Sequence, residues 1–301
     1  MKAKNMKRIT TLALVALGLM ATSCSDDDDA VATTTENLVL NISGLENLGT
    51  DYVYEGWIIV DGAAQTTGTF TVDDNGALSQ TSFTLDKTAL DAATTFVLTI
   101  EPAVGDDPAP SDTHILAGDF SGNSGDLTIS HSAALGNDFS SAMGNYILAT
   151  PSTNIDTDEN KGLWFLDNSS GSPAVGLTLP TLPAGWVYEG WAIIDGQPVS
   201  SGRFTAVDMA DMDGNPYAGT DNGLPPFPGE DFIMGTVDGL DLATATHISK
   251  AVISIEPEAD NSPAPFTLKP LIGADLAADA AVHTVMALSQ NLTFPTGTVS
   301  R

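Results

Sequence analysis

Two short acidic segments carry the residue types and the spacing that could bind calcium. In each segment, side chains with oxygen atoms stand at alternate positions, as the first ligands of an EF-hand loop do. The candidate ligands are Asp156, Asp158 and Asn160 in one segment, and Asp211, Asp213 and Asn215 in the other. Neither segment has the glycine that an EF-hand places at its sixth position. The two interpretations are a calcium site of another type and an acidic loop that only faces solvent.

A repeated pentapeptide places carboxylates beside tryptophans. Val53–Trp57 recurs unchanged as Val187–Trp191, 134 residues later. Exposed aromatic rings can stack on ligands such as sugars. The candidate ligand-binding residues are Glu55, Trp57, Glu189 and Trp191, together with Trp186, which we expect to be partly open at a strand entrance. The alternative is a structural motif in a central strand, in which each glutamate would accept hydrogen bonds from its own domain.

No other group of residues indicates catalysis. The four histidines, His114, His131, His247 and His283, form no pair with the spacing of zinc ligands. The only cysteine, Cys24, is expected to carry lipid, and neither a Gly-x-Ser-x-Gly motif nor a phosphate-binding glycine loop occurs. With 39 acidic residues, some pair of carboxylates will always lie close together, so proximity alone does not indicate a glycosidase. We expect a non-enzymatic protein whose one candidate cofactor is calcium.

The pentapeptide belongs to a long internal repeat. At the same offset of 134, Asp61-Gly62, Gly68 and Phe70 match Asp195-Gly196, Gly202 and Phe204. Two further strings, Ile-Glu-Pro at 100–102 and Pro-Ala-Pro at 108–110, recur at 255–257 and 263–265, an offset of 155. The second copy therefore has 21 extra residues, which we expect as an acidic surface loop within 208–230. The chain is predicted to hold two tandem domains.

Both copies show the pattern of short β-strands. Apolar residues alternate with polar ones from Leu38, and β-rich runs flank Asp61-Gly62, which is a strong hairpin signal. The hairpin turn is expected to extend over several residues before a strand at 66–72. About seven such strands per copy predict an all-β fold, with two tandem immunoglobulin-like β-sandwich domains after a signal peptide and an acidic tether. No long amphipathic helix is expected, only short helical turns near 85–93 and 240–245.

The N-terminus predicts export and lipid anchoring. Four basic residues precede an apolar run from Ile9 to Met20, which is too short to span a bilayer and is followed by Ala-Thr-Ser-Cys24. Cys24 therefore occupies the lipidation position of a bacterial lipobox. The acidic run at 25–29 resembles the export signal of surface lipoproteins. We expect an outer membrane lipoprotein exposed on the cell surface, with the periplasmic face as the alternative.

The charge balance excludes one class of partner. The chain from Cys24 onward keeps all 39 acidic residues but only Lys87, Lys161, Arg203, Lys250, Lys269 and Arg301, which gives a net charge near −33. Such a surface repels nucleic acid, so we expect no DNA or RNA partner. A hydrophobic content of 42% is nevertheless enough to build a core.

These observations predict the following domain boundaries. The segments are a signal peptide at 1–23, a lipidated cysteine and flexible tether at 24–37, a first β-sandwich at 38–152, a linker at 153–173, and a second β-sandwich at 174–301 that contains the insertion.

The repeated strings resemble the C-terminal extracytoplasmic domain of anti-sigma-K factors. The matching positions are Tyr54, Trp57, Gly68, Phe70, Glu101 and Pro102 in the first copy, and Tyr188, Trp191, Gly202, Phe204, Glu256 and Pro257 in the second. An anti-sigma-K factor also has a cytoplasmic sigma-binding domain and a transmembrane helix, and we expect neither here. The resemblance implies an outer, sensing-type domain used without its signalling half. It supplies no ligand-binding or catalytic residue.

Three functions are consistent with these features. The leading hypothesis is a non-enzymatic, lipid-anchored envelope protein that acts as a binding, sensing or adhesion module. One alternative is a surface carbohydrate-binding or processing lipoprotein whose site lies in the 208–230 loop. Another is an accessory subunit of an extracytoplasmic sigma/anti-sigma signalling system. The partner, an envelope protein or a glycan, is not identified by the sequence.

Overall fold

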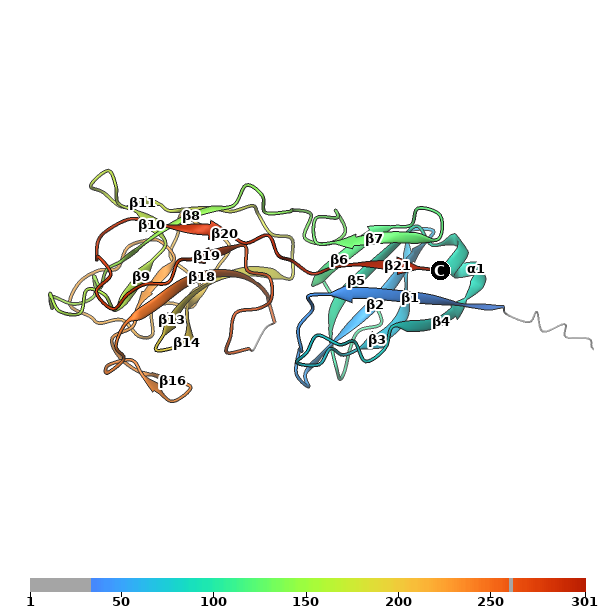
Figure 1. Cartoon of the computed structure of the whole chain (residues 1–301), viewed down its shortest axis with the longest axis horizontal. Coiled ribbons are helices and arrows are strands. Elements are labelled where there is room, and N and C mark those ends of the chain that lie inside the picture. Colours follow the sequence, from blue (N-terminus) through green and yellow to red (C-terminus); the bar gives the residue numbers. More distant parts are fainter. Residues whose placement is uncertain (1–33, 260–261) are drawn as a thin grey trace, which may run out of the picture. The chain divides into compact units, whose positions relative to one another are not determined.

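The structure is a computed structural model that describes residues 34–259 and 262–301 (Figure 1). The expected signal peptide and residues 24–33 of the expected tether, Cys24 included, lie outside the described residues. The first strand, β1 (Thr35–Ser43), begins three residues before the predicted position at 38. Within the described ranges, no helix is long and apolar enough to cross a membrane.

Eight strands form one antiparallel sheet, which we call the first lobe. They are β1, β2 (Tyr52–Val60), β3 (Ala63–Phe70), β4 (Ser82–Asp86), β5 (Thr95–Pro102), β6 (His114–Asp119), β7 (Ser124–Thr128) and β21 (Thr296–Ser300). Their order in the sheet is β3-β2-β5-β6-β7-β21-β1-β4. β2 contains the pentapeptide and pairs with β3 on one side and β5 on the other, as expected for a central strand. The short helix α1 (Lys87–Ala92) follows β4, capped by the Asp86 carboxylate.

The second lobe repeats this sheet with more and shorter strands. They are β8 (Met143–Leu148), β9 (Gly162–Trp164), β10 (Leu166–Asp167), β11 (Ala174–Val175), β12 (Leu177–Thr178), β13 (Trp186–Ile194), β14 (Gln197–Phe204), β15 (Gly229–Asp231), β16 (Thr236–Val237), β17 (Leu240–Asp241), β18 (Ile248–Pro257), β19 (Leu271–Gly273) and β20 (Met286–Gln290). The main sheet runs β14-β13-β18-β19-β20-β8-β9-β15, with β12 also paired to β8. The predicted all-β class with two sandwich-like bodies is confirmed.

The two hairpins that carry the pentapeptide have tight turns. Asp61 and Gly62 have φ angles of 51° and 79°, and Asp195 and Gly196 have φ angles of 49° and 86°. Positive φ at both central residues defines the two-residue turn that best matches the twist of a hairpin. Each return strand therefore starts directly after its glycine, and the expectation of a longer turn was wrong.

The strands of the two lobes do not follow the boundaries expected from the repeat. β21 lies at the end of the predicted second domain but pairs with β1 and β7 in the first lobe. β8 lies within the predicted first domain but pairs with β12, β20 and β9 in the second lobe. The predicted linker at 153–173 contains β9 and β10, whose residues Leu163–Leu166 are buried. The boundaries differ because strand pairing joins segments that are distant in the sequence.

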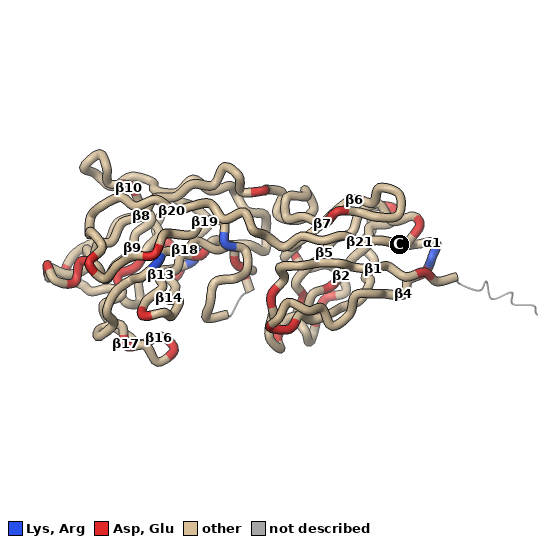
Figure 2. The backbone as a smooth tube through the Cα atoms, viewed as in Figure 1, with Lys and Arg blue, Asp and Glu red and all other residues tan. Residues whose placement is uncertain are grey.

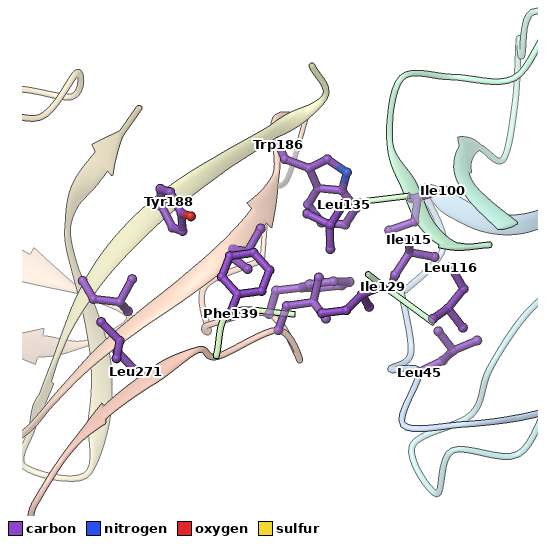
Figure 3. Packing of buried hydrophobic residues seen from close by; sticks show 14 of the residues in the cluster. Leu45, Ile100, Ile115, Leu116, Ile129, Leu135, Phe139, Trp186, Tyr188 and Leu271 are labelled. Carbon is purple, nitrogen blue, oxygen red and sulfur yellow. The ribbon is translucent and has the colours of Figure 1, made fainter. Parts of the chain in front are cut away.

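One hydrophobic core connects the two lobes. A single cluster of buried residues includes Leu98 and Ile115 of the first lobe and Tyr188 and Leu271 of the second. Figure 3 shows Leu135, from the segment that leads to β8, among the buried side chains of this core. Consistent with this core, residues from Thr34 to Arg301 form one compact unit.

Candidate functional site

The pentapeptide glutamates are held by hydroxyl groups of the neighbouring strand. The Thr66 hydroxyl donates to Glu55, and the Ser200 hydroxyl donates to the equivalent Glu189. Each hydroxyl also accepts the backbone N–H two residues further on, at 3.1 Å in both lobes. Burial raises the pKa of Glu55, and the hydrogen bond from Thr66 opposes this rise. Each glutamate thus stabilises a β-bulge in its own hairpin.

All four tryptophans are buried. Trp57 and Trp191 are each 2% exposed, and their indole N–H groups donate to the hydroxyls of Thr99 and Ser254 at 2.9 and 2.8 Å. Trp186, which we expected to be partly open, is 3% exposed and lies against Phe266, with ring centroids 6.1 Å apart. No tryptophan therefore offers a ring face on which a sugar could stack.

A second pair of glutamates closes the loops that follow the Ile-Glu-Pro strings. Glu101 accepts the backbone N–H of Ser111, and Glu256 accepts that of Phe266, both at 2.9 Å. Both side chains are almost completely buried, at 1% and 0% exposure. No sequence pattern predicted a role for this pair, although the recurrence of Ile-Glu-Pro was the signal that could have indicated one.

The insertion packs against the second lobe through its acidic residues. Arg203 donates to both carboxylate oxygens of Asp213, at 3.0 and 2.8 Å, and Asn215 donates to the Gly229 carbonyl at 2.8 Å. Asp211 lies directly over Gly202, where a side chain would collide with it. Glu230, at 1% exposure, accepts the backbone N–H of Asp231 at 2.8 Å.

Two carboxyl groups of this region have strongly raised pKa values. Burial is the main cause that raises the pKa of Glu230 to about 8 and that of Asp211 to about 6. The charge on Asp211 raises the pKa of Glu230 further. The two backbone hydrogen bonds that Glu230 accepts act in the opposite direction.

The candidate calcium ligands make contacts within the protein or lie at its surface. Over the described ranges, no group of three or more His, Cys, Asp or Glu side chains is arranged to hold a metal ion. Asp213 and Asn215 make the contacts given above, and Asp158 accepts the Thr153 hydroxyl at 3.0 Å. Asp156 is exposed in the turn that ends at Asp158, and Asn160 is half-buried in the turn that follows it. Calcium binding at either segment stays a prediction.

A mainly apolar cleft of about 410 Å³ is lined by residues of both lobes. Its lining residues are Glu46, Asn47, Leu48, Gly49, Tyr52, Ile100, Pro102, Ser111 and Thr113 from the first lobe, and Pro257, Ala259, Ser262, Pro263 and Phe266 from the second. Pro102 and Pro257 are equivalent positions of the repeat, as are Ser111 and Phe266. The loops closed by Glu101 and Glu256 therefore form much of the cleft wall.

Hydrogen bonds between the lobes surround the cleft. Tyr52 donates through its hydroxyl to the Ala259 carbonyl at 2.7 Å, and Thr267 donates to the Gly44 carbonyl at 3.0 Å. The Ser111 hydroxyl donates to the Ile100 carbonyl at 2.9 Å. Because these polar groups are satisfied within the protein, the cleft presents mainly aromatic, aliphatic and proline surfaces. A volume of this size suits a small ligand or a few side chains.

Acidic residues are distributed over both lobes, and basic residues are few (Figure 2). Lys269 is one of the six basic residues after Cys24, and its ammonium group donates to the Phe266 carbonyl at 2.6 Å beside the cleft. Burial lowers the pKa of Lys269, and the nearby Glu46 opposes this effect.

Part of the chain matches one known protein family. Residues 13–114 match the family described as the C-terminal domain of the anti-sigma-K factor rskA. The match covers about a third of the chain and lies entirely in its N-terminal part. The resemblance inferred from the first copy is thus supported by this match, whereas the second copy is not included in it. No curated protein and no solved structure matches the chain.

Proposed function

We propose that this chain is a non-enzymatic binding and sensing module of the cell envelope, held to the membrane by a lipidated Cys24. The observation that carries the proposal is the apolar cleft between equivalent loops of the two lobes. The cleft is large enough for a ligand and has an apolar lining. The similarity of residues 13–114 to an extracytoplasmic domain supports the same location outside the cytoplasm.

A neutral apolar dye tests the cleft. N-phenyl-1-naphthylamine avoids repulsion by the acidic surface and fluoresces when it enters an apolar site. We expect saturable binding to the wild-type protein, and about tenfold weaker binding to Leu48→Glu, because a charge in the cleft wall disfavours an apolar ligand.

The matched control is Leu292→Glu, since Leu292 is 48% exposed and does not line the cleft. Circular dichroism checks that both variants are folded. Equal dye affinity in the wild type and in folded Leu48→Glu would show that the cleft is not the binding site.

Anchoring and exposure are tested in cells. We expect mass spectrometry to detect an acylated N-terminal peptide beginning at Cys24, and Cys24→Ser to release the protein from the membrane fraction. Protease treatment of intact cells is expected to digest the wild-type protein. Survival of the intact protein would place it on the periplasmic face.

The family match favours a second candidate function, an accessory subunit of an extracytoplasmic sigma/anti-sigma system. Such a subunit would contact the envelope-exposed part of a membrane-spanning regulator. Crosslinking in whole cells is expected to capture that regulator with the wild-type protein and less of it with Leu48→Glu. Carbohydrate binding, by contrast, has no exposed tryptophan to support it. A glycan array tests this third function directly.

A further inference from the structure

The two lobes exchange one strand with each other. In the first lobe, β21 occupies the position between β7 and β1, and in the second lobe β8 occupies the position between β20 and β12. Gly297 of β21 and Gly144 of β8 are at equivalent places in the two sheets. Their register partners are Leu127 and Ile42 for Gly297, and Leu288 and Leu177 for Gly144. Each lobe is therefore completed by a strand that follows the other lobe in the sequence.

β21 fits its position closely. We call the space between β1 and β7 the exchange slot. Five residues of β21 pair with each of its two neighbours, and Val299 is fully buried. A side chain at Gly297 would lie 2.5 Å from the Asn41 carbonyl oxygen, so the slot requires glycine there. Beyond the strand, Arg301 donates to the Ala93 carbonyl at 2.9 Å, and its guanidinium lies 4.4 Å from the centre of the Phe120 ring.

The two connections that lead to the exchanged strands contact each other. Residues 129–142 lead from β7 to β8, and residues 291–295 lead from β20 to β21. Phe139 and Phe294, one from each connection, have ring centroids 5.7 Å apart. The Gln290 side chain also donates to the backbone carbonyls of residues 140 and 142, at 2.7 and 2.8 Å.

The contacts that hold β21 in the slot are of two kinds. The pairing of β21 in the slot and the contacts of Arg301 involve only the first lobe and the strand itself. They would be the same whichever chain supplied the strand, whereas the contacts between the connections favour the strand of the same chain. Exchange of identical elements between copies is a low-cost route to a dimer, because the exchanged strand keeps its contacts in the slot and only the contacts between the connections change.

We propose that the exchange slot also accepts β21 of a second copy of this chain, so that two chains form a dimer by reciprocal exchange of their last strands. This inference is independent of any ligand in the cleft. It assigns the slot, lined by β1 and β7, as an interaction surface for the segment 291–301 of the partner copy.

A disulfide between two chains tests the exchange. Asn41 of β1 and Thr298 of β21 are exposed register partners, and Cys24 is the only native cysteine. In a Cys24→Ser background, one tagged chain carries Asn41→Cys and a second, differently tagged chain carries Thr298→Cys. The two thiols face each other only when β21 of the second chain occupies the slot of the first. After incubation at high concentration and mild oxidation, we expect a disulfide-linked heterodimer.

The control measures random collision between exposed thiols. It pairs Thr298→Cys with Ser169→Cys, because Ser169 is exposed on the second lobe and not in the slot. We expect the slot pair to give several-fold more heterodimer than the control pair. Weakening the contacts between connections with Gln290→Ala and Phe294→Ala is expected to raise the yield further. A yield equal to that of the control, from variants shown to be folded by circular dichroism, overturns the proposal.

Discussion

At the residue scale, the side chains of the repeated strings make structural contacts within the protein. The Tyr54 hydroxyl donates to the carbonyl of Glu46 at 3.0 Å, and that of Tyr188 donates to Pro180 at 2.7 Å, eight residues upstream in both cases. The buried glutamates accept hydrogen bonds from hydroxyl or backbone N–H groups of nearby loops and strands. A buried carboxylate is costly unless it is hydrogen-bonded, which explains why each glutamate recurs together with its donor.

Because of Glu230, we expect the free energy of unfolding to fall as pH rises. Its pKa is about 8 in the folded protein and near 4.5 when unperturbed. Because the folded value is the higher one, the neutral form is favoured in the fold, and stability is lost as pH rises from about 4.5 through 8. The full effect is on the order of 5 kcal/mol. We expect Glu230→Gln to flatten the dependence of the melting temperature on pH between 5 and 9.

The matched control for this prediction is Glu258→Gln, which changes an exposed glutamate in the same way. It is expected to leave the pH dependence close to that of the wild type. If Glu230→Gln and the wild type lose stability in parallel over this range, ionisation of Glu230 does not limit stability.

At the element scale, both pentapeptide hairpins share an irregularity that glycine makes possible. The register shifts after Gly56 in β2 and after Gly190 in β13. A side chain at Gly56 would lie 2.3 Å from the Thr67 hydroxyl and 2.9 Å from the Phe96 ring. At Gly190, the Ser201 hydroxyl would be 2.4 Å away. The bulge thus lets a neighbouring side chain cover the strand closely.

Gly56→Ala is expected to destabilise the protein by about 1–3 kcal/mol, because the added methyl group overpacks this contact. Thr67→Ala removes the nearest colliding atom, so the double variant Gly56→Ala, Thr67→Ala should recover part of the loss. Chemical denaturation of the four proteins measures both effects. Strict additivity of the two substitutions would show that the hydroxyl and the methyl group do not compete for space.

Local sequence patterns predicted many of the strands but not β8 or β21, and not how distant strands pair. Alternation and the Asp-Gly turns predicted the strands and the two pentapeptide hairpins because these are interactions between neighbours in the sequence. The exchange of β8 and β21 depends on which distant slot each strand fits. Tyr146 and Leu148 of β8 are buried, whereas β21 buries chiefly Val299. Neither set of buried residues shows which strands β8 or β21 will pair with. The cleft was missed for the same reason, since its walls come from both lobes.

At the scale of the whole molecule, the dominant electrostatic feature is the net charge near −33. Like charges repel in the folded state, and salt screens this repulsion over a distance that falls from about 30 Å at 0.01 M to about 8 Å at 0.15 M. We expect the melting temperature to rise with NaCl concentration. CaCl₂ at the same ionic strength should raise it further only if calcium binds a site. Equal melting temperatures in the two salts would show that the calcium prediction is wrong.

The strand exchange and the shared core predict that the two lobes unfold together. Leu271 of the second lobe and Leu98 of the first are both fully buried in the cluster that spans the lobes. Leu271→Ala should cost about 2–5 kcal/mol. If the two lobes unfold as one unit, this loss of stability lowers the protection of every amide that exchanges through global unfolding. Hydrogen exchange should therefore show reduced protection of β5 in the first lobe as well as of β18 in the second, and Leu98→Ala should do the same in reverse. Independent domains would lose protection only in the lobe that carries the substitution. Such a result would mean that the exchanged strands join two separately stable units, and that β21 could leave its slot without unfolding the second lobe.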